Sequence, residues 1–103
     1  MDDAKMLELA FAFHGHRCPA MPTGFRLARE MMRRLSVERA RDSELLALVE
    51  TGADHFAGCF ADGVMAATGC TFGKGNIRRL NYGKFAVTLY DPGRKMGVRG
   101  LMR

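Results

Sequence analysis

The chain has 103 residues, of which 48% are hydrophobic and 26% are charged, and its formal net charge is +5. This length predicts one domain, residues 1–103, with a thin core, and the hydrophobic content excludes intrinsic disorder. No stretch approaches the ~20 consecutive apolar residues of a membrane helix, and the acidic start argues against a signal peptide. We therefore expect a cytoplasmic protein with no membrane partner.

The first expected helix covers residues 3–13, with Asp2 or Asp3 as its N-terminal cap. Residues 14–22 contain a glycine and two prolines, which break helical structure. A second helix is expected over residues 24–36, capped by Thr23, because its apolar side chains recur every three or four residues.

Positive charge concentrates in residues 26–41, which hold six arginines and two glutamates. Two interpretations are open: a nucleic-acid-binding surface, or the solvated face of the second helix. This segment has no aromatic side chain beyond the neighbouring Phe25 on which bases would stack. We therefore do not expect nucleic acid as a partner.

The second half of the chain mixes strands with one further helix. The apolar run Leu45–Thr51 is ambiguous, and we interpret it as a helical start that becomes a strand around residues 47–50. A helix is expected over Phe56–Thr68, ending at Gly69, and a loop or turn over residues 70–80.

Alternating apolar side chains make Lys84–Tyr90 the clearest strand. The turn signal Asp91-Pro92-Gly93 follows it, and residues 96–102 can return as a paired strand. This order of elements predicts the α+β class, with helices packed on a small, mostly antiparallel sheet.

The strongest chemical signal is His14-Gly15-His16-Arg17-Cys18. In an extended segment, residues two apart point to the same side, so His14, His16 and Cys18 would present two imidazoles and a thiolate to one point. These ligands suit zinc and similar divalent metals. The alternative is that one histidine and Cys18 are simply packed and the other histidine is exposed.

A second cluster contains His55, Cys59 and Asp62, of which Cys59 and Asp62 share one helix face with Gly63 and Ala66. The small residues leave room for a ligand or another chain. Cys59 is expected in the first helical turn, where the helix N-terminus favours a thiolate. The alternative is a cysteine packed in the core. No disulfide framework is expected from the odd count of three cysteines.

A third segment, Thr68–Asn76, is rich in glycine but fails the phosphate-loop pattern, because glycine is missing at Thr68 and a hydroxyl at Gly75. Nucleotide hydrolysis is therefore excluded. The loop amides with Lys74 can hold an anion, or the segment is only a helix cap and a tight turn.

Five motifs in order resemble the FmdE family, which takes its name from one component of formylmethanofuran dehydrogenase. They are Phe13-His14-Gly15-His16-Arg17-Cys18-Pro19, Gly24-x-Arg26, Cys59-x-x-Asp62-Gly63, Thr68-Gly69-Cys70-Thr71-Phe72-Gly73-Lys74-Gly75-Asn76 and Gly83-Lys84-x-Ala86. The resemblance implies an α+β core domain in an intertwined homodimer, without the C-terminal zinc finger of some relatives. It also implies a metal site at His14, His16, Cys18 and Cys59, with further pocket candidates at His55, Asp62, Cys70, Thr71 and Lys74.

Three functions follow as hypotheses. The first is a dimeric metal-binding accessory domain with a pocket for a small ligand. It would be linked to molybdenum or formylmethanofuran-type one-carbon metabolism, with a larger dehydrogenase complex as its partner. Its metal would be zinc, with nickel or iron as alternatives. The second is an enzyme that uses a metal-bound water or the Cys59 thiolate, with Asp62 or His55 moving protons. The third is a structural or assembly subunit.

Overall fold

A computed structural model describes residues 2–102 of the chain. Within them lie three helices and four strands, in the order α1 (Asp3–His14), α2 (Ala20–Leu35), β1 (Leu46–Val49), α3 (His55–Thr68), β2 (Ile77–Arg79), β3 (Ala86–Asp91) and β4 (Met96–Leu101). The four strands form one sheet in the order β2-β1-β3-β4. Only the β1–β2 pair is parallel. The expected α+β class with a mostly antiparallel sheet is thus confirmed.

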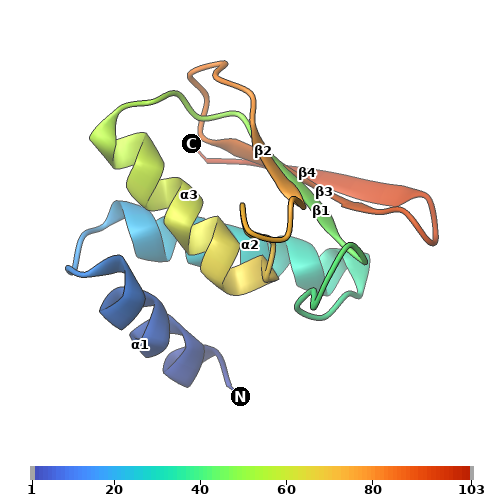
Figure 1. The fold of residues 1–103 in the computed structure, drawn as a ribbon, viewed down its shortest axis with the longest axis horizontal. Helices are drawn as coiled ribbons and strands as arrows, with labels where there is room; N and C mark the ends of the chain where they lie inside the picture. Colours follow the sequence, from blue (N-terminus) through green and yellow to red (C-terminus); the bar gives the residue numbers. More distant parts are fainter. Residues whose placement is uncertain (1, 103) are drawn as a thin grey trace.

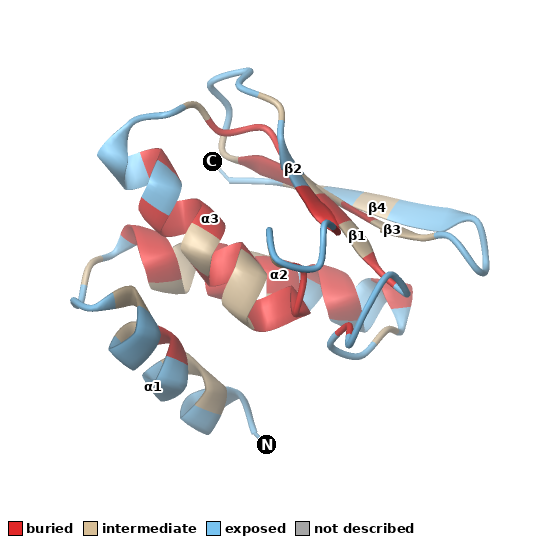
Figure 2. Cartoon of the chain, in the orientation of Figure 1, coloured by how far each residue is buried: buried red, intermediate tan, exposed pale blue. Residues whose placement is uncertain are grey.

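The helices and the sheet form two layers, with α2 and α3 packed together beneath the sheet and α1 lying outside them (Figure 1). Burial follows this arrangement, because the facing sides of α2 and α3 are buried whereas α1 is mostly exposed (Figure 2). Phe25 from α2 and Phe60 from α3 are among the largest fully buried side chains. The core therefore lies between the helix pair and the sheet, and α1 is a peripheral element.

Two glycines bring the backbones of α2 and α3 unusually close. A Cβ on Gly24 would collide with the backbone carbonyl of Phe60, and a Cβ on Gly63 would collide with that of Met21. The space beside Gly63, expected to receive a ligand or another chain, is therefore filled by α2 itself. This packing places the start of α2 against the middle of α3.

Helix α2 begins at Ala20, earlier than expected, and Thr23 lies inside it instead of capping it. The Thr23 hydroxyl donates to the carbonyl of Pro19, 2.7 Å away. Proline is tolerated in the first turn because those N–H groups have no partner within the helix. Pro22 therefore does not delay the helix as a proline in its interior would.

The ambiguous apolar run 45–51 contains strand β1, so its expected helical start is wrong. Strand β2 lies within residues 70–80, which were expected as a loop or turn, so that expectation is wrong for Ile77–Arg79. Only one of its three residues is buried, and its extended form depends on parallel pairing with β1. The hairpin of β3 and β4 is present as expected. No helix among the described residues is long and apolar enough to cross a membrane.

Candidate metal centre

The structure brings His14, His16, Cys18 and Cys59 together, although they come from three parts of the fold. His14 ends α1, His16 and Cys18 lie in the loop before α2, and Cys59 belongs to α3. One ligand atom from each of the four lies within 4.8 Å of the other three. The four side chains therefore face one point that a metal ion can occupy.

The histidines and Cys18 converge in a way that the sequence pattern did not predict. The segment is not a uniformly extended strand, since His14 still belongs to α1 and Gly15 has a φ of +99°. This left-handed conformation is open to glycine at little cost. The chain therefore reverses immediately after His14, which brings His16 and Cys18 back toward its imidazole.

Distances within the cluster match those between two ligands of one ion. The Sγ atom of Cys18 lies 3.7 Å from Nε2 of His14, and Sγ of Cys59 lies 4.0 Å from Nε2 of His16. Zinc bonds to sulfur and nitrogen in a tetrahedral site place such pairs about 3.6 Å apart. The side chains therefore need only small movements to bind a tetrahedral ion.

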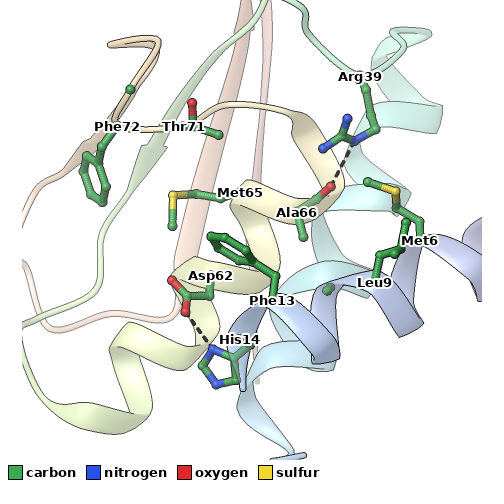
Figure 3. A pocket seen from close by; sticks show the side chains of 12 residues that line it. Met6, Leu9, Phe13, His14, Arg39, Asp62, Met65, Ala66, Thr71 and Phe72 are labelled. Atoms are coloured by element: carbon green, nitrogen blue, oxygen red, sulfur yellow. Dashed lines mark hydrogen bonds and ion pairs between the residues drawn. The ribbon is translucent and has the colours of Figure 1, made fainter. Parts of the chain in front are cut away.

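Asp62 orients one of the imidazoles. Its Oδ2 atom lies 2.7 Å from Nδ1 of His14, whose side chain is only 7% exposed (Figure 3). A proton on Nδ1 is donated to this carboxylate, which leaves the lone pair of Nε2 directed at the cluster. Carboxylates that hold a ligating histidine in this way are a recurrent part of metal sites.

The two thiols in the cluster differ in acidity. Burial tends to raise the pKa of Cys18, but interactions with the Met21 backbone, Cys59 and His14 outweigh it and lower the pKa. Burial raises the pKa of Cys59, and the neighbouring Cys18 raises it further. The expectation of a Cys59 thiolate favoured by the helix N-terminus is therefore wrong, because Cys59 is the fifth residue of α3 and lies past its free N–H groups.

The acidity of His14 is also perturbed. Burial lowers its pKa, but the hydrogen bond to Asp62 and the contact with Cys18 raise it more, so the pKa lies above its ordinary value. Because a ligating imidazole must give up the proton on Nε2, protons compete with a metal ion for this side chain.

A cavity of about 430 Å³ lies beside the cluster, between α1, α3 and the loop after α3. Its walls are largely apolar, and the Phe13 ring extends from the end of α1 toward Met65 (Figure 3). His14 and Asp62 form the part of the wall that it shares with the metal cluster. Thr71, one of the expected pocket residues, lines the opposite end. The volume of the cavity falls within the range of small-molecule sites.

The remaining candidates occupy different positions. His55 is exposed and its Nε2 lies 3.8 Å from Sγ of Cys59, beside the cluster. Cys70 is fully buried, and its thiol donates to the carbonyl of Leu45. The Lys74 ammonium donates to the carbonyl of Gly69, the C-terminal cap of α3, at 2.8 Å, and to the carbonyl of Ala40, in the connection after α2, at 3.2 Å. The structure gives Cys70 and Lys74 packing roles, whereas sequence reasoning proposed them for a pocket.

These features define a small α+β domain with a His/Cys cluster that can hold a metal ion. The chain belongs to the FmdE family, because residues 13–103 match the model described as FmdE, Molybdenum formylmethanofuran dehydrogenase operon. The family resemblance found in the five sequence motifs is thereby confirmed.

Two relatives extend the comparison. A probable S-adenosyl-L-methionine-binding protein of Archaeoglobus fulgidus is 36% identical over 99 residues, which are 92% of this chain and 26% of that protein. An FmdE-like protein of Syntrophus aciditrophicus, described as similar to a component of tungsten formylmethanofuran dehydrogenase, has a related structure, with a TM-score of 0.66 and 32% identity over 85% of this chain and 43% of that one. This chain therefore spans less than half of either relative.

Proposed function

We propose that this domain binds one transition-metal ion through His14, His16, Cys18 and Cys59 and serves as an accessory component of one-carbon metabolism. The observation that carries the proposal is the His14 imidazole, held by Asp62 on one nitrogen and directed at the two thiols and His16 by the other. A merely packed histidine does not need a carboxylate on its far side.

Zinc is the metal that this donor set favours, with nickel or iron as alternatives. Two thiols and two imidazoles match the Cys₂His₂ set of tetrahedral zinc sites. Softer sulfur ligands disfavour magnesium and calcium, which prefer oxygen. The bound ion would supply Lewis-acid chemistry, and the four side chains hold it in place.

The family points to the metabolic setting. Its model refers to a molybdenum formylmethanofuran dehydrogenase operon, and the Syntrophus relative is described as like a component of the tungsten enzyme. The chain has only three cysteines, too few for the Cys₄ set of an iron–sulfur cluster. We infer that it assists a larger dehydrogenase complex and does not carry the electrons itself.

We also propose that the chain forms a homodimer. Large apolar side chains beside the cavity are open to solvent, with exposed fractions of 88% for Phe13, 65% for Phe72 and 52% for Leu9. Exposed apolar groups gathered in this way favour a surface that meets another protein. Light scattering of the purified chain tests this proposal, and a monomer at all concentrations contradicts it.

Nucleic acid is not among the proposed partners, because three of the six arginines of the basic segment pair with acidic side chains. Arg33 and Arg34 pair with Glu30, and Arg29 pairs with Asp3. This pairing supports the interpretation of residues 26–41 as a solvated helix face.

Metal analysis of the purified protein tests the proposed centre. We expect wild type to hold about one zinc, nickel or iron ion per chain, as a four-ligand site requires, and Cys18→Ser and Cys59→Ser to lose it. Cys70→Ala is the matched control, because Cys70 lies in the core, and it should retain the metal. Equal, negligible metal in wild type and both serine variants contradicts the proposal.

The cavity favours a second candidate, an enzyme or sensor that binds a small molecule next to the metal. Asp62 contacts the cavity and also His14, so a ligand there would influence the metal centre. S-adenosylmethionine is a reasonable first ligand to test, given the name of the Archaeoglobus relative. Turnover that is lost on chelation and restored by metal would distinguish an enzyme from a binding domain.

A further inference from the structure

We propose that His55 is a fifth, exchangeable donor at the metal centre, on its solvent side. This inference rests on the proposed metal-binding function and adds a residue outside the four-membered cluster. By withdrawing, His55 would open a coordination position to a small neutral or anionic Lewis base, while the other four residues keep the ion bound.

The position of His55 on α3 brings it to the cluster. It is the first residue of the helix and precedes Cys59 by four positions, so both side chains lie on one helical face. Its Nε2 atom lies 3.8 Å from Sγ of Cys59, between the 3.7 and 4.0 Å of the two thiol–imidazole pairs inside the cluster. His55 therefore has the same spacing to a thiol as the proposed ligands.

A second contact holds the His55 ring beside the cluster. It stacks on His16, with ring centroids 5.8 Å apart and an angle of 14° between the planes. Both rings present Nε2 to the Cys59 sulfur, although one comes from the loop before α2 and the other from α3. Two elements far apart in sequence thus direct imidazole nitrogens at one thiol.

Exposure and position together explain why His55 would be the donor that leaves. Cys59 is buried, and the His14 side chain is 7% exposed and held by Asp62. His16 and His55 are both exposed, but His16 belongs to the four residues whose ligand atoms lie within 4.8 Å of one another, whereas His55 approaches Cys59 from outside that set. Among residues 2–102, the polar and ring contacts of the His55 side chain are those to Cys59 and His16. An exposed side chain at the first position of a helix can rotate away without disturbing the core.

With His55 the centre has five donors, one more than a tetrahedral ion needs, and it can therefore exist in two forms. With His55 bound, the ion is closed to solvent ligands, and with His55 released, a small base can take its place. The proposal therefore assigns to this site the chemistry of reversible ligand exchange, which a closed structural zinc site lacks.

Cobalt(II) absorption tests the proposal, because its visible bands respond to coordination number. The proteins to compare are wild type, His55→Ala and His55→Gln, with Gly58→Ala as the matched control. Gly58 lies in the same part of α3, and a Cβ there meets nothing within 4 Å. Imidazole is then titrated into each cobalt-loaded protein as the exogenous base.

We expect both His55 variants to bind cobalt with an altered visible spectrum and to bind imidazole about tenfold more tightly than wild type, an effect within the range of changes around metal sites. Gly58→Ala should match wild type in both readouts. If the His55 variants have the wild-type spectrum and imidazole affinity while wild type binds cobalt, the role of His55 is overturned and the metal centre stands. If wild type binds no cobalt, the metal centre itself is overturned.

Discussion

The hydrogen bond between Asp62 and His14 should determine how tightly the site holds its metal. Asp62→Asn keeps an oxygen that accepts from Nδ1 but removes the negative charge, whereas Asp62→Ala removes both. We expect the two variants to bind zinc more weakly than wild type, with the alanine variant the weaker. Both variants reduce the basicity of the His14 imidazole, and the alanine variant also removes the acceptor that fixes the orientation of the ring.

The structure sets the size of these effects. Loss of such a carboxylate typically weakens metal binding by about 10- to 100-fold, or about 1.4 to 2.8 kcal/mol. The Asp62 side chain is 36% exposed, so solvent screens part of its charge. For Asp62→Asn we therefore expect a loss near the lower limit, about tenfold. The His14 side chain is only 7% exposed and would lose its carboxylate acceptor in Asp62→Ala, which should approach the upper limit of about 100-fold.

Competition with a chromophoric chelator measures these affinities. Glu38→Gln is the matched control, because it removes one negative charge from a position outside the cluster. Urea unfolding of the metal-free proteins shows whether any loss of affinity comes from a damaged fold. If both Asp62 variants hold zinc as tightly as wild type, Asp62 does not support the site and the argument from His14 fails.

Three further predictions concern the fold that carries the site. Gly63→Ala should lower the free energy of unfolding by about 3 kcal/mol, since its Cβ meets backbone atoms of α2, whereas Gly58→Ala should raise it by up to about 1 kcal/mol; urea unfolding measures both, and equal effects refute the packing argument. Arg99 holds the pKa of the buried Glu50 carboxyl below its ordinary value. The stabilisation that this ion pair gives to the folded state is therefore present at neutral pH and is lost as the pH falls through that lowered pKa. In Arg99→Gln, urea unfolding at about pH 7 and about pH 4 should show a smaller loss on acidification than in wild type, and an unchanged loss contradicts this linkage. Lys74→Met should lower the unfolding free energy by about 1 kcal/mol, because the ammonium donates to the carbonyls of Gly69, at the C-terminal cap of α3, and of Ala40; an unchanged unfolding free energy would show that solvent replaces the ammonium.

The acidity of His14 gives one more prediction, on metal release. Because its pKa lies above the ordinary value, zinc affinity should begin to fall at a higher pH than an unperturbed histidine would allow, and it should continue to fall on acidification. Asp62→Asn lowers the His14 pKa and should move this fall to lower pH. Zinc affinities measured across the acid range test the prediction, and identical profiles for the two proteins contradict it.

Local patterns in the sequence were sufficient for some parts of the structure. The spacing of His14, His16 and Cys18 indicated a metal site, since all three lie within five residues. The apolar alternation around β3 and the turn after it indicated the hairpin. Both signals depend on neighbours in the chain, which a single sequence displays directly.

Other parts depend on contacts between distant segments, and no local pattern reveals them. Cys59 joined the ligand set only through the resemblance to a family, because it lies 41 positions after Cys18 in the chain. The bond from Asp62 to His14 spans 48 positions, and the Asp62 side chain gave no sign of its partner beyond sharing a helix face with Cys59. Strand β2 was missed for the same reason, because its extended form depends on pairing with β1.

The close packing of α2 and α3 links the fold to the site. The backbones approach at Gly24 and Gly63, near the start of α2 and the middle of α3. Cys18 precedes α2 by two residues, and Cys59 lies one helical turn before Gly63, so this approach sets the distance between the two thiols. A wider helix pair would separate Cys59 from the histidine loop, whereas α1 could shift without moving either thiol. The same two glycines that close the core of this small domain therefore also determine whether a metal ion can be held at its surface.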